Sequence, residues 1–183
     1  MSREMKSRII DPAAKKCKHG SGNNGIHPGI MEPFNIVLVE PEIPPNTGNI
    51  ARLCAATGTR LHLVGKLGFS TDDRYLKRAG LDYWEHVDLT YWESLEALQS
   101  RFPEGRYFYL TTKASRSFLD AGFRPGDFLV FGKETKGLPA ELIAANPETS
   151  ITIPMPAGTV RSLNLSTSAG IVLYEALRQG GVL

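Results

Sequence analysis

Three polar segments of this chain carry side chains that are suited to chemistry on a bound ligand. They read P-N-T-G-N-I-A-R at residues 45–52, F-G-K-E-T-K-G-L-P at residues 131–139 and P-M-P-A-G-T-V-R-S-L-N-L-S at residues 154–166. Their amide, carboxylate, guanidinium and hydroxyl groups can orient a polar substrate or move a proton. Gly132 and Gly137 also allow a backbone to come close to a ligand. Glu134, which lies between these glycines, is more consistent with an orienting role than with a surface acid.

Each of these segments directly follows a predicted β-strand. Apolar and β-branched runs predict strands at residues 34–40, 60–65, 84–89, 106–112, 127–131 and 151–153. Helical spacing and stop signals predict helices that end at Gly58 and Gly80, a helix striped by residues 92, 95, 98 and 102, and helices at 139–145 and 162–177. This alternation indicates an α/β fold with a largely parallel sheet flanked by helices on both faces. The three polar segments are therefore expected to meet at one sheet edge and line one pocket.

Two of the predicted helices begin with residues that also suit a binding site. In the first, Asn46 or Thr47 can cap the helix, and Arg52 lies near the helix start and so near the edge where ligands bind. The final helix opens on small polar residues, including Ser162 and Asn164. They either cap a closely packed helix or help to hold a ligand at its N-terminus. These residues by themselves leave both interpretations open.

The composition is that of an ordinary globular protein, with 42% hydrophobic and 22% charged residues. We expect residues 1–30 to form a disordered basic tail and residues 31–183 a single domain. No apolar run reaches the roughly 20 residues that span a membrane, and the first residues lack the apolar core of a signal peptide, so we expect a cytosolic protein with no membrane partner. Cys17, His19 and His27 fit no standard zinc spacing, so no metal is expected.

The net charge of +2 hides an uneven distribution. Residues 1–30 hold six Lys/Arg and two Asp/Glu, whereas residues 31–183 hold 15 Lys/Arg and 17 Asp/Glu. A nucleic-acid partner must therefore be argued from a local patch. Arg74, Lys77 and Arg78 share one face of a predicted helix and can contact phosphates, although a solvated helix face gives the same pattern. His62, inside a strand, is expected to be structural.

Several familiar sites are excluded by the motifs. The first strand-helix turn, N-T-G-N, lacks the glycines of the dinucleotide fingerprint. G-K-E-T-K-G is followed by Leu138 and Pro139, where a phosphate-binding loop requires Lys and Ser/Thr. The chain contains neither a G-x-S-x-G nucleophile turn nor an H-E-x-x-H pair.

The order and spacing of the three polar segments resemble the signature motifs of the SPOUT (trefoil-knotted) RNA methyltransferases. K-R-A-G-L-D-Y at residues 77–83 adds to this resemblance, which extends over residues 34–178. It implies a deep C-terminal trefoil knot, S-adenosylmethionine as cofactor, no metal, and a homodimer in which Arg52 approaches the partner's cofactor. The polar active-site set is Asn46, Arg52, Glu134, Ser162 and Asn164. The cofactor-lining set is Leu110, Gly132, Ile153, Ser162 and Leu163.

Within that family, the resemblance is closest to small enzymes that methylate the ribose 2′-hydroxyl of the wobble nucleotide, cytidine or modified uridine 34, in the anticodon stem-loop of tRNA. Two alternatives are a relative acting on another tRNA or ribosomal RNA site, and a catalytically silent RNA-binding protein. The complete polar set argues against the silent protein. Lys133 replaces the proline usual in the family, and the loop at residues 155–161 is one residue longer than in close relatives. Both departures affect the cofactor loops.

Overall fold

A computed structural model describes residues 32–69 and 86–183. The basic tail and Arg74, Lys77 and Arg78 lie outside these residues, so their predicted roles stay predictions. In the described part, six strands form one parallel sheet in the order β3-β2-β1-β5-β4-β6. Their bounds are β1 (Asn35–Val39), β2 (Arg60–Val64), β3 (Leu89–Trp92), β4 (Tyr107–Leu110), β5 (Phe128–Phe131) and β6 (Ser150–Ile151).

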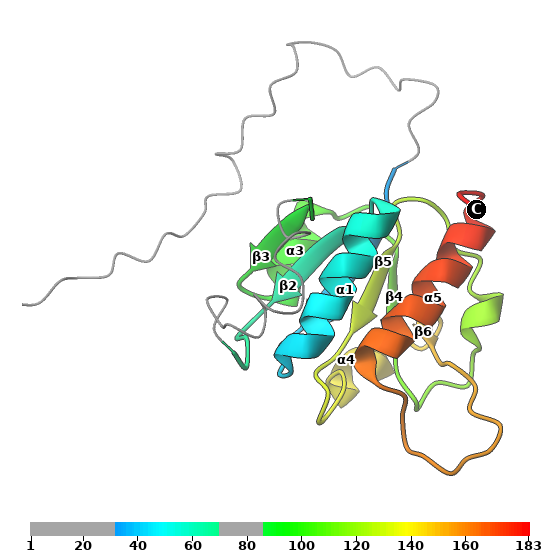
Figure 1. Ribbon diagram of the computed structural model, residues 1–183. Coiled ribbons are helices and arrows are strands. Elements are labelled where there is room, and N and C mark those ends of the chain that lie inside the picture. Colours follow the sequence, from blue (N-terminus) through cyan, green and yellow to red (C-terminus); the bar gives the residue numbers. More distant parts are fainter. Residues whose placement is uncertain (1–31, 70–85) are drawn as a thin grey trace, which may run out of the picture. The chain divides into compact units, whose positions relative to one another are not determined.

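Helices cover both faces of this sheet, as the alternating pattern predicts (Figure 1). They are α1 (Pro44–Thr57), α3 (Leu95–Arg101), α4 (Ala140–Ala145) and α5 (Leu165–Gln179), with a 3₁₀ turn, η1 (Phe118–Asp120). On β1, Ile36 and Leu38 pack in the core under α1 and α5, whereas Val37 packs in the core under α3 and α4. Both faces of the strand are thus buried, which explains its unbroken apolar run.

The first helix begins differently from the prediction. Pro44 and Pro45 occupy its first turn, Ile43 precedes it, and no side chain caps it. Proline suits this turn because its missing N–H would be unpaired there. Asn46 and Thr47 are buried inside α1, so the prediction that one of them caps the helix is wrong. Asn46 is therefore available for a different contact.

The predicted strand at residues 84–89 is also misplaced. Residues 84–85 lie outside the described part, and β3 runs over Leu89–Trp92. Trp92 ends this strand instead of starting a helix, because its indole N–H donates to Nδ1 of buried His62 (3.0 Å). The helix begins only after Ser94, whose hydroxyl accepts a hydrogen bond from the N–H of Ala97 (3.2 Å).

The β6 strand runs inside the connection between β4 and β5. On one side, the N–H of Thr111 donates to the carbonyl of Ile151 (3.0 Å). On the other side, Thr152 donates to the carbonyl of Arg116 (2.8 Å) and accepts from the N–H of Phe118 (2.9 Å). After β6, the chain forms a long loop and returns as α5, which lies beside α1 (Figure 1).

Candidate active site at the carboxyl edge of the sheet

The carboxylate of Glu134 connects the segment after β5 to the start of α1. Its Oε2 accepts the backbone N–H of Glu42 (2.8 Å), and its Oε1 accepts the N–H of Ile43 (3.2 Å) and the side-chain amide of Asn46 (2.9 Å). Three N–H donors thus fix the position of this carboxylate at the start of α1. Glu134 is thus held by the first polar segment, and its orienting role toward a substrate stays a prediction.

Asn164 extends this network to the third polar segment. Its amide nitrogen donates to Oδ1 of Asn46 (3.0 Å), and its own Oδ1 accepts from Ser166 N–H (2.9 Å), Ser166 hydroxyl (2.8 Å) and Thr167 N–H (3.3 Å). Asn164 is therefore the N-cap of α5 and a partner of the active-site network at once. Of the two roles that the sequence left open for this end of α5, the structure shows the capping role, and binding of a ligand there stays a prediction.

Sequence reasoning missed a second set of contacts between the first two polar segments. Oε2 of Glu42 accepts hydrogen bonds from the backbone N–H (3.2 Å) and the hydroxyl (2.8 Å) of Thr135. Glu134 in turn accepts the N–H of Glu42, so the loop after β1 and the loop after β5 are joined by hydrogen bonds in both directions. Glu40 also pairs with Lys133 (2.5 Å). The acidic pair in E-P-E opposite K-E-T was the available signal for these contacts.

Lys133 has a specific partner that accounts for its presence in this loop. Its ammonium donates a hydrogen bond to Glu40, and this bond raises the pKa of Lys133. The ion pair ties the loop after β5 to Glu40, the residue that directly follows β1. The replacement of the usual proline thus adds a connection between the two loops.

Gly132 and Gly137 shape the loop itself. A Cβ on Gly132 would lie only 2.1 Å from the backbone carbon of Gly137, so no side chain fits there. Gly137 has a φ of +69°, which favours glycine, and its N–H donates to the carbonyl of Lys133 (2.8 Å). The close approach at Gly132 is therefore to the loop's own backbone, whereas the sequence suggested an approach to a ligand.

The predicted cofactor residues follow three adjacent strands. Leu110 ends β4, Gly132 directly follows β5, and Ile153 lies two residues after β6, so all three lie at the carboxyl edge. All three aliphatic side chains are half-buried: Leu110 at the end of β4, and Ile153 and Leu163 at the two ends of the loop between β6 and α5. Apolar walls beside exposed backbone groups suit a nucleoside with a flat ring and polar edges. These residues fit S-adenosylmethionine.

Two predicted catalytic residues lie apart from this hydrogen-bonded network. Ser162 is exposed in the loop before α5. Arg52 is the ninth residue of α1, so it lies about 12 Å along the helix from its first residue. The expectation that Arg52 lies near the helix start is therefore wrong, and its exposed side chain belongs to the outer face of α1.

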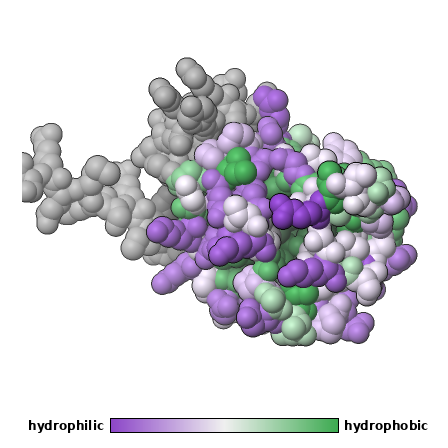
Figure 2. Space-filling view, turned by 90° about the horizontal axis from the view of Figure 1, so that it is seen from below, coloured by the Kyte–Doolittle hydropathy of each residue, from purple (hydrophilic) through white to green (hydrophobic). Residues whose placement is uncertain are grey.

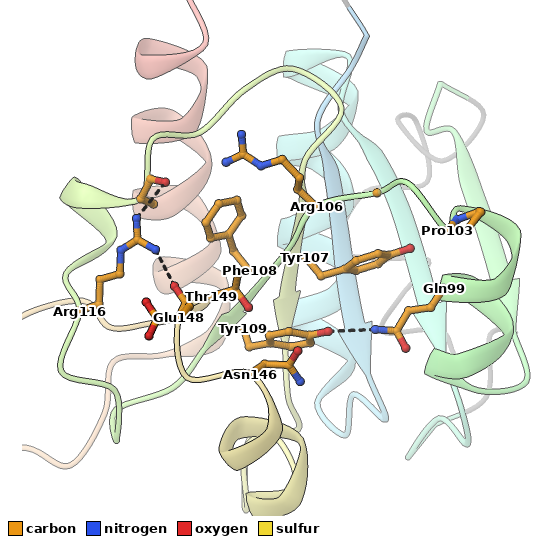
Figure 3. A pocket seen from close by; sticks show the side chains of 12 residues that line it. Gln99, Pro103, Arg106, Tyr107, Phe108, Tyr109, Arg116, Asn146, Glu148 and Thr149 are labelled. Atoms are coloured by element: carbon orange, nitrogen blue, oxygen red, sulfur yellow. Dashed lines mark hydrogen bonds between the residues drawn. The ribbon is translucent and has the colours of Figure 1, made fainter.

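A cavity of about 530 Å³ lies elsewhere on the molecule. Figure 3 shows that Tyr107 and Tyr109 of β4, Gln99 of α3 and Asn146 contribute side chains to it. None of the described residues that line it belongs to the predicted site, because the cavity surrounds the start of β4 and the site surrounds its end. We place the candidate active site at the carboxyl edge, where the polar segments converge.

Residues 32–69 and 86–183 contain neither a membrane-spanning helix nor a metal-binding cluster. None of the helices in these ranges is both long and apolar enough to cross a membrane. In this part of the chain, no group of three or more His, Cys, Asp or Glu side chains is arranged to hold a metal ion.

Comparison with known proteins agrees with this geometry. Residues 33–174 match the SpoU rRNA Methylase family. The chain belongs to this family. A tRNA (cytidine(34)-2'-O)-methyltransferase of Methylovorus glucosotrophus is 54% identical to this SpoU protein over 147 residues, which cover 80% of this chain and 95% of the relative.

Solved structures of methyltransferases have a similar fold. One, described as giving structural insights into the 2-OH methylation of C/U34 on tRNA, is 48% identical, has a TM-score of 0.76, and the match covers 81% of this chain and 96% of that chain. An AdoMet-bound rRNA methyltransferase from Sinorhizobium meliloti is 26% identical with a TM-score of 0.70, covering 84% and 58% of the two chains.

Proposed function

We propose that this SpoU-family protein transfers a methyl group from S-adenosylmethionine to the ribose 2′-hydroxyl of nucleotide 34, the wobble cytidine or modified uridine, in the anticodon stem-loop of tRNA. The relatives at about 50% identity that carry this activity in their names support the substrate. The AdoMet-bound relative supports the cofactor. The observation that carries the proposal is the Glu134-Asn46-Asn164 network, which joins all three polar segments at the edge beside the cofactor residues.

In this proposal, Leu110, Ile153 and Leu163 hold the cofactor beside the backbone that follows Gly132. When bound, S-adenosylmethionine supplies an electrophilic methyl group on a sulfonium. The 2′-hydroxyl must lose its proton as it attacks this methyl in line, so positioning and charge stabilisation dominate the catalysis. Ser162, exposed beside Leu163, offers a hydroxyl to the substrate or cofactor. Glu134 orients Asn46, which in turn holds Asn164.

Arg52 acts as an electrostatic clamp in this reaction. A guanidinium with a pKa above about 12 is a poor general base at neutral pH. It is well suited to bind the adjacent phosphate and to stabilise the alkoxide that develops on the ribose. The adjacent phosphate can relay the released proton to water. Arg52 is the ninth residue of α1, and in this proposal it serves the site of a second subunit.

The outer surface of α1 and α5 supports a homodimer. The two helices lie side by side, and Ile171 (37% exposed) and Tyr174 (50% exposed) are large apolar residues on the outward side of α5. Arg52 is exposed on α1. Apolar residues beside a charged one are typical of a surface that pairs with another protein. In a two-fold dimer, each subunit would offer Arg52 to its partner.

The path of the chain supports the trefoil knot. Residues 150–152 run between β4 and residues 116–118 of the connection to β5, so the C-terminal segment enters a closed stretch of backbone. Gln179, the last residue of α5, then donates to the carbonyl of Leu119 (3.0 Å) and accepts the N–H of Phe123 (2.8 Å). The end of α5 is thus fastened to the same connection. We further propose a cytosolic protein with one catalytic domain at residues 31–183.

The decisive experiment uses tRNA from a strain that lacks methylation at nucleotide 34. Purified protein and labelled S-adenosylmethionine should label this tRNA, and mapping should place the methyl on the ribose of nucleotide 34. Arg52→Ala should abolish transfer and leave cofactor affinity nearly unchanged, because Arg52 contacts the RNA and not the cofactor. Methylation at another tRNA or ribosomal RNA site would overturn the substrate. RNA binding without any transfer would identify a silent homologue.

A further inference from the structure

Positive charge is concentrated in the loops at the carboxyl ends of three neighbouring strands. Residues 111–117, 132–138 and 152–164 follow β4, β5 and β6 and together contain five Lys/Arg and one Asp/Glu. Residues 31–183 as a whole contain 15 Lys/Arg and 17 Asp/Glu. The edge that holds the candidate site is thus basic within an acidic domain, and such a local concentration attracts polyanions.

Two of the five cations are bound to groups of the protein itself. Lys133 pairs with Glu40. Arg116 donates to the carbonyl of Glu148 (2.5 Å) and the carbonyl of Asp120 (2.7 Å), and Figure 3 shows its side chain turned toward the backbone around it. These two side chains hold loops together, so they are unsuited to hold an external ligand.

The other three cations, Lys113, Lys136 and Arg161, remain available. All three side chains are exposed, and among the described residues none of them donates a hydrogen bond or forms an ion pair. Glu134, the acid nearest to Lys136 in sequence, already accepts three N–H donors. Figure 2 looks onto this edge and shows strongly hydrophilic residues spread over it, with apolar residues exposed between them.

The strand order places these cations beside the predicted cofactor residues. β4 lies between β5 and β6, so the three loops are neighbours, and adjacent strands are about 4.8 Å apart. Lys113 follows Leu110 by three residues, Lys136 follows Gly132 by four, and Arg161 directly precedes Ser162. Cations on neighbouring loops repel one another, and a bound chain of phosphates would relieve this repulsion.

We propose that Lys113, Lys136 and Arg161 form a phosphate-binding rim that holds the RNA backbone on both sides of the target nucleotide. This inference rests on the proposed function, because it names the residues that present the RNA to that site. The spread of three cations over three loops fits the repeated phosphates of a single-stranded loop. The carboxylate of the cofactor is the competing anion, and it would occupy only one of them.

The test compares two charge-matched double variants. Lys113→Gln/Lys136→Gln alters the rim, and Arg101→Gln/Arg124→Gln removes two exposed cations from residues that line the opposite, amino edge. Binding of a fluorescent anticodon stem-loop is measured over a series of salt concentrations. The rim variant should bind about tenfold more weakly, and the slope of log affinity against log salt should fall by about 1.4, or about 0.7 for each single-strand phosphate that a cation no longer neutralises. The control should change neither value.

Three outcomes separate the alternatives. An unchanged salt slope in the rim variant, or an equal loss in the control, overturns the rim. If the rim variant instead loses affinity for S-adenosylmethionine in calorimetry and keeps the salt slope of RNA binding, these cations bind the cofactor carboxylate and the rim proposal is wrong. If the salt slope falls as expected but the wild-type protein does not methylate nucleotide 34, the rim binds a different RNA. In that case only the proposed substrate is wrong. Adding Arg161→Gln should lower the slope by a further step of similar size.

Discussion

At the residue scale, His62 is a structural histidine whose protonation state is set by its neighbours. Its Nδ1 accepts from the indole of Trp92 (3.0 Å), so the proton lies on Nε2, which faces Oδ1 of Asn35 (3.2 Å). Asn35 in turn donates to the carbonyl of Gly126 (3.0 Å). Burial is the main cause that lowers the pKa of His62 to about 4. The negative charge of Asp88 raises this pKa, and the positive charge of Arg60 lowers it further. The neutral ring is thus part of the fold, as the sequence predicts.

The lowered pKa of His62 predicts that the folded protein loses stability in acid. In the unfolded chain the pKa of histidine is about 6.5, so below that pH the unfolded state binds a proton that the folded state excludes. The stabilisation by neutral His62 is complete above about pH 6.5 and is lost as the pH falls toward 4, by about 2 to 3 kcal/mol at pH 4.5.

Urea unfolding at a series of pH values measures this loss. His62→Gln is the control, since a glutamine can accept from Trp92 and donate to Asn35 without titrating. As the pH falls from 6.5 to 4.5, the free energy of unfolding should decrease more for the wild type than for the variant. Parallel pH curves for the two proteins would contradict the assignment, because the carboxylates titrate equally in both.

At the element scale, the loop between β1 and α1 is positioned by the loop between β5 and α4. Glu42 holds Thr135, and Glu134 holds the backbone of Glu42 in return. The segment after β2 supports this arrangement, because Gly68 donates to the carbonyl of Pro41 (2.9 Å). A Cβ at Gly68 would lie 2.8 Å from the Cα of Glu42, so only glycine permits this packing. Glu42 is therefore a positioning residue for Glu134.

Removing the Glu42 carboxylate should slow the reaction without weakening substrate binding. Glu42→Ala leaves the contacts of Glu134 but frees Thr135, so the loop moves and kcat falls by about 10- to 100-fold while KM for tRNA stays within about twofold. Steady-state methyl transfer measures both constants. Glu42→Gln should restore most of kcat, since its carbonyl can accept from Thr135. A rise in KM with unchanged kcat would instead indicate direct contact with RNA.

At the scale of the whole molecule, the proposed dimer explains why Arg52 lies away from the network on its own chain. The exposed apolar residues Ile171 and Tyr174 lie on the α5 side of the same surface. Because a two-fold interface presents the same surface from both subunits, Arg52 of one chain can complete the site of the other. Two incomplete subunits should then form one complete site.

Mixing two inactive variants tests this arrangement. Arg52→Ala retains the cofactor loops, and Asn164→Ala retains Arg52 but loses the cap of α5. After unfolding and refolding in equal amounts, random pairing puts half of the chains in mixed dimers with one complete site of two, so activity should recover to about a quarter of wild type. Mixing without subunit exchange is the control. No recovery in verified mixed dimers would show that Arg52 serves its own subunit.

Much of the fold and part of the site follow from local sequence patterns. A capping asparagine, an apolar run or a glycine stop depends on a few neighbouring residues, so the parallel sheet, its covered faces and the cap function at the start of α5 were predictable. The same local signals led to errors where a distant partner intervened. Trp92 lies in a strand, where its indole N–H donates a hydrogen bond to buried His62, and Asn46 contacts Glu134 instead of capping α1.

Local patterns in the chain were enough to predict which segments are polar, which strands they follow and that they meet at one edge. The side chains that touch there could be identified only from the folded chain. Glu42 and Thr135 are 93 residues apart, and Asn46 and Asn164 are 118 apart. Such pairs depend on the strand order, which places the loops after β1, β5, β4 and β6 next to one another. No local pattern encodes that order, because it is set by the packing of all the strands and helices together.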